Sequence, residues 1–422
     1  MTYEAMLQKL YNLKGAGLDL EGILRSLGDP QKSFRAIRVA GTNGKGSVCA
    51  FLAQILQEAG FRVGLFTSPH LVHPEERIRV NNYEISRAEF HAQFARIWAV
   101  IEGMHGAESE RYARFFEVLT LMALDYFRTQ NVDWAVIECG VGARTDATRV
   151  IAAPVAVLTN VELDHRESLG ETIAQIAYQK AAVVSEGGIL ITAEPKPEAL
   201  EEIARECQLK NAQLIQLDLS GLQAKSNSWD GQRFDWRDYK DLELSLLGGY
   251  QLQNAVLALE AASAVGIRER AIRLGLRTTR WPGRMELLQK NPYVMLDGAK
   301  NPAGMRALCA ALSALKYERL LVIMGISDRK DAAAMVREIA SHADSVIVTR
   351  AAFRGIDPEY LASLVCPYGV PCAVVAPPER ALEAALAQAH QNDLICVTGS
   401  LFVVGEVRAQ WRGREHSVED LS

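Results

Sequence analysis

A short apolar strand that runs directly into a glycine-rich turn and then into a helix is the feature that most constrains this chain. Residues 39–47 read VAGTNGKGS, and helical periodicity follows from Lys45 to about Glu58. Glycines let successive backbone N–H groups converge on phosphate oxygens, and the positive end of the following helix points at the anion. Lys45 adds a mobile cation, and the Ser47 hydroxyl is placed to reach Mg²⁺. The stretch therefore predicts a binding site for a nucleoside triphosphate.

The loop departs from the generic phosphate-binding pattern GxxxxGK[ST]. Gly41 and Gly44 stand closer together than the pattern requires, and Gly46 separates Lys45 from Ser47. A glycine-rich turn with a solvated surface lysine is the structural alternative. Strand, turn and helix follow one another in the order that phosphate binding requires, so we favour the phosphate site.

Length and composition set the broad class of the protein. The 422 residues exceed one ordinary core, and the 49% apolar content suffices for two globular domains. The net charge of −5 offers no basic field for nucleic acid. We find no secretory signal and no apolar stretch near the ~20 residues that span a bilayer. Seven scattered cysteines without a C-x-x-C pair argue against disulfides and structural zinc. We expect a cytoplasmic, monomeric enzyme that binds small molecules, with no nucleic-acid or membrane partner.

Apolar runs alternate with helical periodicity through the first part of the chain. Parallel strands joined by crossover helices give this alternation, so we expect a sheet covered on both faces. Ligands of such sheets bind at the carboxyl ends of the strands, where the polar motifs of this part fall. The expected strands are 36–40, 62–66, 134–138, 155–159 and 188–192.

A second α/β series follows a break in the pattern. Residues 218–247 are polar and poorly periodic, which suggests a small β excursion, and Pro282 and Gly283 then interrupt regular structure. We predict an α/β fold with two domains. A P-loop-containing, mainly parallel sheet domain spans residues 1–281, and a smaller Rossmann-like α/β domain spans 282–422. The strands expected in the second domain are 294–296, 320–324, 345–348 and 394–397.

Three polar side chains of the first domain, Ser68, Glu138 and His165, follow or close predicted strands. Because such strand ends meet at one edge of a sheet, these groups can converge over the phosphate loop and ligate Mg²⁺. Glu138 closes an apolar strand, where a carboxylate without a partner is costly, and a cation explains it better than packing does. Its neighbour Cys139 is interpreted as a small buried thiol rather than a nucleophile.

Residues 140–145 mimic a dinucleotide-binding fingerprint after a strand. Thr145 replaces the third glycine of that fingerprint, and the loop at 41–47 already fills the phosphate role. We therefore reject a nicotinamide enzyme. A guanine-binding N-K-x-D motif is also absent, which argues against a GTPase switch.

The motifs along residues 35–305 resemble, in order and spacing, those of folylpolyglutamate synthases and dihydrofolate synthases, a branch of the ATP-dependent Mur ligase superfamily. Several ordered motifs are far more specific than any one of them. They are GTNGKGS at 41–47, TSPHL at 67–71, ERIRV at 76–80, FE at 116–117, ECGVGARTDAT at 138–148, DH at 164–165, LG at 169–170, QNA at 253–255, PGR at 282–284 and DGAKNP at 297–302, with TGSL at 398–401 in the same pattern.

The resemblance implies an ATP-dependent, Mg²⁺-using ligase that adds L-glutamate to a pteroate or folate, with Lys45, Glu138, His165 and Lys180 as its catalytic residues. Lys180 matches a carbamylated lysine of the family that ligates a second Mg²⁺; without the resemblance it reads as a solvated helix lysine. Position by position, the resemblance implies ATP contacts from Gly41, Thr42, Asn43, Gly44, Lys45, Gly46, Ser47, Asn254, Arg284 and Asp297, Mg²⁺ ligation by Ser68, Glu138, His165 and Lys180, and a substrate site with Arg77, Phe116, Asp146 and Lys300.

These parts suit the activation of a carboxylate. Its oxygen attacks the γ-phosphorus of ATP to give an acyl phosphate, and an amine then displaces phosphate to form an amide. Metal ions and Lys45 would neutralise the charge on the transferring phosphoryl group. Closure at a hinge near Pro282 would exclude water from the acyl phosphate.

Four positions depart from the family's pattern. Ala143 replaces a glycine, Arg149 an asparagine, Gln179 a glutamate and Lys300 a histidine. Lys300 borders the implied amino-acid and phosphate site, so a cation there bears on the identity of the incoming amine.

Two alternatives to a folate ligase stay open. One is a Mur-type ligase that acts on a non-folate carboxylate. The other is a nucleotide-binding paralogue without ligase activity. The joint presence of the four candidate metal ligands argues against the second, because nucleotide binding alone does not need two metal sites.

Overall fold

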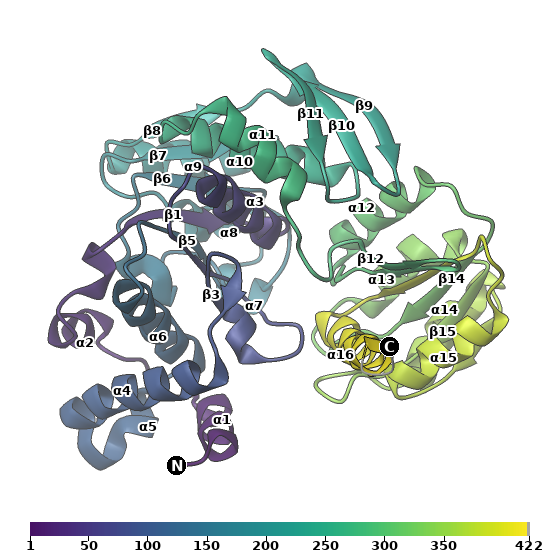
Figure 1. Cartoon of the computed structure of the whole chain (residues 1–422), viewed down its shortest axis with the longest axis horizontal. Coiled ribbons are helices and arrows are strands. Elements are labelled where there is room, and N and C mark those ends of the chain that lie inside the picture. Colours follow the sequence, from purple (N-terminus) through teal and green to yellow (C-terminus); the bar gives the residue numbers. More distant parts are fainter. Residues whose placement is uncertain (420–422) are drawn as a thin grey trace. The chain divides into compact units, whose positions relative to one another are not determined.

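The computed structural model describes residues 1–419 and divides the chain into two compact units. Each unit has its own parallel-dominated sheet (Figure 1). The predicted α/β class is therefore confirmed, whereas the predicted domain division at residues 281 and 282 stays a prediction. The first unit comprises Met1–His70, Pro74–Gly221 and Gln253–Thr279, and the second comprises Leu71–His73, Leu222–Leu252 and the chain from Arg280 onward.

The first unit is built on an eight-stranded sheet in the order β4-β3-β2-β5-β1-β6-β7-β8. The neighbours from β2 to β8 run parallel, so their carboxyl ends lie along one edge; β3 and β4 are antiparallel additions. The strands expected from apolar runs are all present, and β3, β4 and β8 were not expected. The strands are β1 Arg35–Ala40, β2 Val63–Phe66, β3 Ile78–Val80, β4 Tyr83–Glu84, β5 Trp134–Glu138, β6 Val155–Leu158, β7 Ile189–Thr192 and β8 Gln213–Gln216.

Helices cover both faces of this sheet. Helix α3 (Lys45–Glu58) leads from β1 to β2, whereas α8 (Ile173–Ala181) leads from β6 to β7 in the opposite direction along the sheet. Right-handed crossovers therefore place them on opposite faces. Helix α3 packs against α11 (Glu269–Thr278), and the two helices lie side by side in Figure 1. The other helices of this unit are α1 Tyr3–Asn12, α2 Leu20–Ser26, α4 Arg87–His105, α5 Ser109–Tyr112, α6 Phe115–Thr129, α7 Arg166–Leu169, α9 Pro197–Leu209 and most of α10 Tyr250–Ala264.

Two apolar clusters fill the face that α8 covers. One joins α1, α2, α4 and α6 to strand residues such as Ala36, and the other joins α8 and α9 to strand residues such as Ala40. Side chains alternate along a strand, so Arg38 of β1 points to the same face as these two alanines. A buried arginine therefore stands where the two clusters meet.

The second unit contains a six-stranded sheet in the order β12-β13-β17-β14-β15-β16 and a separate antiparallel sheet, β11-β10-β9. The small sheet confirms the β excursion expected at 218–247. In the larger sheet only β12 is antiparallel; α12, α13 and α14 pack on one face, and α15 and α16 on the other. The elements are β9 Leu222–Ser228, β10 Gly231–Trp236, β11 Tyr239–Leu244, β12 Glu286–Lys290, β13 Tyr293–Leu296, α12 Pro302–Ser313, β14 Leu320–Met324, α13 Ala332–Ile339, β15 Ser345–Val348, α14 Pro358–Val365, β16 Cys372–Val374, α15 Pro378–Gln388, β17 Leu394–Thr398 and α16 Leu401–Glu419.

The helices of residues 1–419 do not meet the requirements of a membrane span. None of them combines the necessary length with the necessary apolar content.

Gly275 of α11 lets two helices meet at close range. A Cβ atom at this position would lie 2.6 Å from the Cα and 2.8 Å from the backbone nitrogen of Ile55 in α3. We predict that Gly275→Ala lowers the free energy of unfolding by about 1–3 kcal/mol, because helix backbone cannot yield as a flexible side chain does. Urea unfolding measures the change.

Gly103→Ala in α4 is the matched control. A Cβ atom at Gly103 meets nothing within 4 Å. Alanine is the better helix former, so this variant should gain about 0.5–1 kcal/mol. Equal effects of the two substitutions would contradict the packing role of Gly275.

Candidate active site

The glycine-rich loop connects the end of β1 to the start of α3. Gly41 and Gly44 adopt φ values of 144° and 83°, which residues with side chains rarely take. A Cβ atom on Gly44 would also lie 2.4 Å from Asn254 Oδ1, so a side chain has no room there. Gly44 supplies no side-chain cap to α3, and the first N–H groups of a helix have no intrahelical acceptor. Those N–H groups suit a bound phosphate.

Residues directly after β6 hold this loop in place. The Asn43 N–H donates to Asn160 Oδ1 at 2.9 Å, and Thr159 Oγ1 donates to the Asn43 carbonyl at 2.6 Å. The Thr42 N–H donates to the Asn160 carbonyl at 2.9 Å. The sequence analysis gave Thr159 and Asn160 no role in binding. The feature that could have identified them is their position as two polar residues at the end of an apolar strand. Three hydrogen bonds within the protein thus hold the loop in this conformation.

Three predicted site residues meet beside the loop. Glu138 at the end of β5 is buried; its Oε1 lies 3.9 Å from Lys45 Nζ, and its Oε2 accepts the Ser68 N–H at 2.9 Å. Lys45 Nζ also donates to the Thr42 carbonyl at 3.2 Å. A carboxylate and an ammonium group therefore face each other at the carboxyl edge of the sheet. The structure brings Lys45, Ser68 and Glu138 together as expected, and their individual roles stay predictions.

Lys180 and His165 occupy different surroundings. Lys180 of α8 is buried, and its Nζ donates to the Gly41 carbonyl at 2.8 Å, so it reaches the phosphate loop. His165 is exposed just before α7, with φ of 51°, and its N–H donates to Asp164 Oδ1 at 2.9 Å. Among residues 1–419, no three His, Cys, Asp or Glu side chains group closely enough to hold a metal ion. The Mg²⁺ ligand set stays a prediction.

Phe116 and Asp146 both lie beside Gly140. A Cβ atom at Gly140 would sit 3.0 Å from Asp146 Oδ2 and 3.1 Å from the ring of Phe116. The Asp146 carboxylate accepts the Gly140 N–H at 3.0 Å and the Thr148 hydroxyl at 2.6 Å. Burial raises the pKa of Asp146, and the hydrogen bonds from Thr148 and the charge of Arg38 oppose that rise. An aromatic ring and a carboxylate acceptor thus adjoin the strand that ends in Glu138.

Arg77 is buried beside His70 and Phe115. Its Nε donates to His70 Nδ1 at 2.9 Å, and its guanidinium lies 5.1 Å from the centre of the Phe115 ring. Burial lowers the pKa of Arg77 to about 10. The guanidinium therefore remains protonated at neutral pH and offers a positive charge to an acidic ligand.

The predicted residues of the second unit cluster at the end of β13. Asp297 is buried and accepts the Met285 N–H at 3.0 Å, the Ala299 N–H at 2.9 Å and the Tyr250 hydroxyl at 3.3 Å. Burial raises the pKa of Asp297, and the nearby charge of Arg284 opposes the rise. Tyr250 was not predicted. Lys300 is partly exposed and immediately precedes Asn301, whose side chain caps α12.

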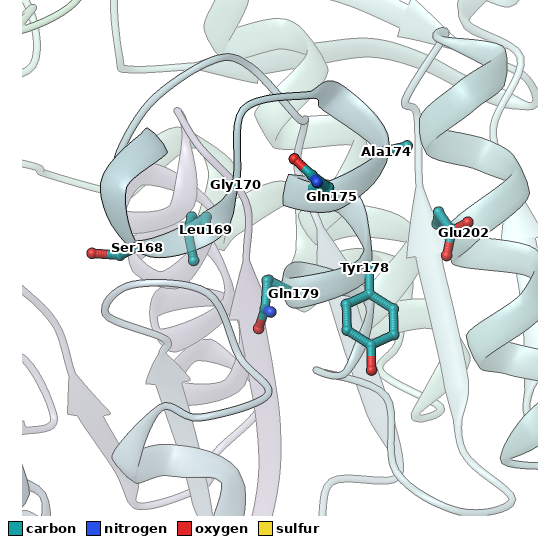
Figure 2. Close-up of a pocket in the computed structure, with 8 residues that line it drawn as sticks. All are labelled: Ser168, Leu169, Gly170, Ala174, Gln175, Tyr178, Gln179 and Glu202. Carbon is teal, nitrogen blue, oxygen red and sulfur yellow. The ribbon is translucent and has the colours of Figure 1, made fainter.

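A pocket of about 480 Å³ flanks α8, the helix that carries Lys180. Figure 2 shows Tyr178 and Gln179 on α8, with Glu202 on the neighbouring α9. No lysine or arginine lines the pocket, so it does not suit a phosphate. Its lining residues are Ser168, Leu169, Gly170, Ala174, Gln175, Tyr178, Gln179 and Glu202.

A fixed phosphate loop with a facing lysine and buried carboxylate, at the carboxyl edge of a parallel sheet, defines a nucleotide-dependent phosphoryl-transfer enzyme. The comparisons with known proteins narrow this class. The model of the Mur ligase middle domain matches residues 39–262, and that of the Mur ligase glutamate ligase domain matches residues 283–401.

Individual relatives agree with the domain matches. The folylpolyglutamate synthase of Lacticaseibacillus casei is 37% identical over 331 residues, which cover 76% of this chain and 77% of the relative. The dihydrofolate synthase/folylpolyglutamate synthase of Bacillus subtilis is 33% identical over 407 residues, 92% of this chain and 93% of the relative. The structure of Mycobacterium tuberculosis folylpolyglutamate synthase complexed with ADP superposes with a TM-score of 0.88 at 29% identity, over 97% of this chain and 99% of that one. The chain belongs to the folylpolyglutamate synthase/dihydrofolate synthase family of Mur ligases, and it is an ATP-dependent ligase.

Asn160→Ala tests the anchoring of the phosphate loop. The substitution removes the acceptor of the Asn43 N–H, so the loop loses one of its fixed positions. We expect ATP to bind about tenfold more weakly, which corresponds to the loss of one buried hydrogen bond. Calorimetric titration with ATP measures the affinity. Asn227→Ala, on an exposed strand of the second unit, is the control and should leave it unchanged; unaltered ATP affinity in Asn160→Ala would refute the anchoring role.

Proposed function

We propose that this ligase joins L-glutamate to the carboxylate of a pteroate or a folate through an acyl phosphate, with release of ADP and phosphate. The observation that carries the proposal is the continuity of two features along one segment. Strand β5 ends in Glu138, which faces Lys45 of the phosphate loop, and Gly140, two residues further on, lies beside both Phe116 and Asp146. The phosphate loop and the slot formed by Phe116 and Asp146 therefore lie next to each other.

The reaction needs positioning and charge neutralisation more than covalent help from the protein. The substrate carboxylate attacks the γ-phosphorus, and the amino group of glutamate then attacks the acyl carbon and expels phosphate. Lys45 neutralises negative charge that spreads over the transferring group. The fixed loop N–H groups hold the phosphates in line for both steps.

Mg²⁺ fits the residues beside the loop. The Glu138 carboxylate supplies hard oxygen ligands, which this ion prefers, and the Ser68 N–H that it accepts orients it. Ser68, Glu138 and His165 would hold one ion, and a carbamate on Lys180 would help to hold a second. When bound, the ions supply charge stabilisation at the phosphate oxygens.

The slot around Gly140 suits a flat heterocycle. Phe116 offers an aromatic face, and Asp146 offers acceptors for the N–H donors of a pterin ring. Arg77 is the candidate for an acidic group of the substrate. Asn254, Arg284 and Asp297 remain candidates for the nucleotide, and Lys300 for the incoming amino acid.

We also propose that the enzyme works as a monomer in the cytoplasm. The cysteines support a reducing compartment. All seven are free thiols, and only Cys366 and Cys372 are exposed.

Release of ADP in the presence of glutamate and a panel of acids tests the proposed function. Dihydropteroate and reduced folates should support turnover, whereas UDP-sugar peptides should not. Lys45→Ala should reduce turnover by at least about 10²-fold, because the charge that stabilises the transition state is lost. Activity on UDP-sugar peptides alone would refute the folate assignment, and full activity of a folded Lys45→Ala enzyme would remove the loop from the mechanism.

Lys180 gives a separate prediction. If a carbamate forms on its Nζ, removal of CO₂ at low pH should lower activity and bicarbonate should restore it. Lys180→Ala should be rescued in part by short carboxylic acids, which replace the missing anion. The control is Lys32, an exposed lysine whose substitution by alanine should change neither response. Full activity in CO₂-free buffer would contradict carbamylation.

A further inference from the structure

A second cavity of about 390 Å³ lies away from the phosphate loop. Segments that precede β6, β7 and β8 line it, so it opens at the amino-terminal edge of the sheet, opposite to the edge that carries the loop. Helix α2 adds one side chain. The lining residues are Glu21, Arg38, Ala143, Arg144, Arg149, Val150, Ile151, Ala152, Ala182, Val184, Ser185, Glu186 and Lys210.

Arg38 is the unusual member of this lining. It stands in the middle of β1 with only 2% of its surface exposed. Its acceptors are all uncharged: the Val183 carbonyl at 3.2 Å, Thr148 Oγ1 at 3.4 Å and the Cys139 sulfur at 3.8 Å. Its Nε has no acceptor within the described part of the chain. The buried Asp146 carboxylate acts on Arg38 only at a distance: the Thr148 hydroxyl accepts from Arg38 and donates to Asp146, and the charge of Arg38 opposes the rise in the pKa of Asp146. A buried cation without a direct ion pair is costly, and a second anion would offset that cost.

A second arginine of the cavity, Arg149, also forms no ion pair with a carboxylate of the described residues; its charge acts at a distance on Glu117, where it opposes the rise in pKa that burial causes. Arg149 is exposed, and its one hydrogen bond within the described part of the chain reaches the Asp146 carbonyl at 3.4 Å. The other two cations differ, because both Arg144 and Lys210 pair with Glu206.

The acidic groups of the lining do not neutralise these two arginines by direct contact. Glu186 accepts a hydrogen bond from Asn211 at 2.9 Å. Glu21 lies on the exposed side of α2 and forms no ion pair with Arg38 or Arg149. Arg38 at the base and Arg149 at the mouth are therefore the cations of the cavity that form no direct ion pair with a carboxylate of residues 1–419.

We propose that this cavity binds a small oxyanion with two negative charges, either inorganic phosphate or the phosphate group of a small phosphomonoester. Arg38 and Arg149 are its charged ligands, and guanidinium groups match phosphate oxygens in geometry and charge. The site is distinct from the phosphate loop and does not depend on the proposed substrate.

Hydrogen bonds link the cavity to the candidate substrate slot. Thr148 Oγ1 accepts from Arg38 at 3.4 Å and donates to the Asp146 carboxylate at 2.6 Å. An anion that draws the Arg38 guanidinium toward the cavity therefore changes the hydrogen bonding of Asp146. Through the single residue Thr148, binding of the anion would therefore regulate the substrate slot.

Calorimetric titration with sodium phosphate at constant ionic strength tests the proposal. Lys45→Ala is the background, because it weakens any competing phosphate binding at the loop. In this background phosphate should bind, and adding Arg149→Gln should weaken binding about tenfold or more, as expected for the loss of a charge-assisted hydrogen bond. Arg38→Gln should weaken it further. Arg149 is exposed, so its variant decides the matter even if Arg38→Gln fails to fold.

Arg111→Gln is the charge-matched control, since Arg111 is an exposed arginine paired with Glu108. It should leave phosphate binding unchanged. Tighter binding of glycerol phosphate than of phosphate identifies a phosphomonoester as the ligand, and the reverse order identifies free phosphate. No binding of either at 10 mM, or equal effects of Arg149→Gln and Arg111→Gln, would overturn the proposal.

Discussion

The hydrogen bonds between the glycine-rich loop and the residues after β6 are the interaction on which the rest of the site depends. A loop with three glycines in seven residues has many conformations open to it, and most of them do not direct N–H groups at one point. Thr159 and Asn160 select one conformation from the side of β6, and Lys180 adds a bond to Gly41 from α8. Lys45 then reaches the carboxylate at the end of β5. Because the protein itself supplies these bonds, a phosphate meets donors that need little reorganisation.

The sequence could predict the elements whose own residues are apolar or periodic. Helix α3 was expected from Lys45 to about Glu58 and spans those residues, and the central strands followed from runs that are buried on both faces. Strands β8 and β16 were missed because their side chains are partly or wholly exposed. Such edge strands exist through pairing with a neighbour, and no local pattern records that pairing.

The candidate site was predictable to the extent that its parts sit at strand ends. The loop, Ser68 and Glu138 each follow an apolar run, and the parallel sheet brings those ends together. The slot formed by Phe116 and Asp146 depends on the absence of a side chain at Gly140, which only packing in three dimensions reveals. Arg38 was missed for the same reason. In the sequence it is a single charged residue in a strand, and only the structure reveals that it is buried and that its hydrogen-bond acceptors are uncharged.

The distribution of thiols has a practical consequence for spectroscopy. Cys49, Cys139, Cys207, Cys309 and Cys396 are buried, so these five react slowly with alkylating dyes. The two exposed thiols, Cys366 and Cys372, both belong to the second unit. A maleimide fluorophore therefore marks that unit alone on the native chain, without removal of any cysteine. Together with a second fluorophore engineered into the first unit, this label allows the distance between the two units to be measured by single-molecule energy transfer.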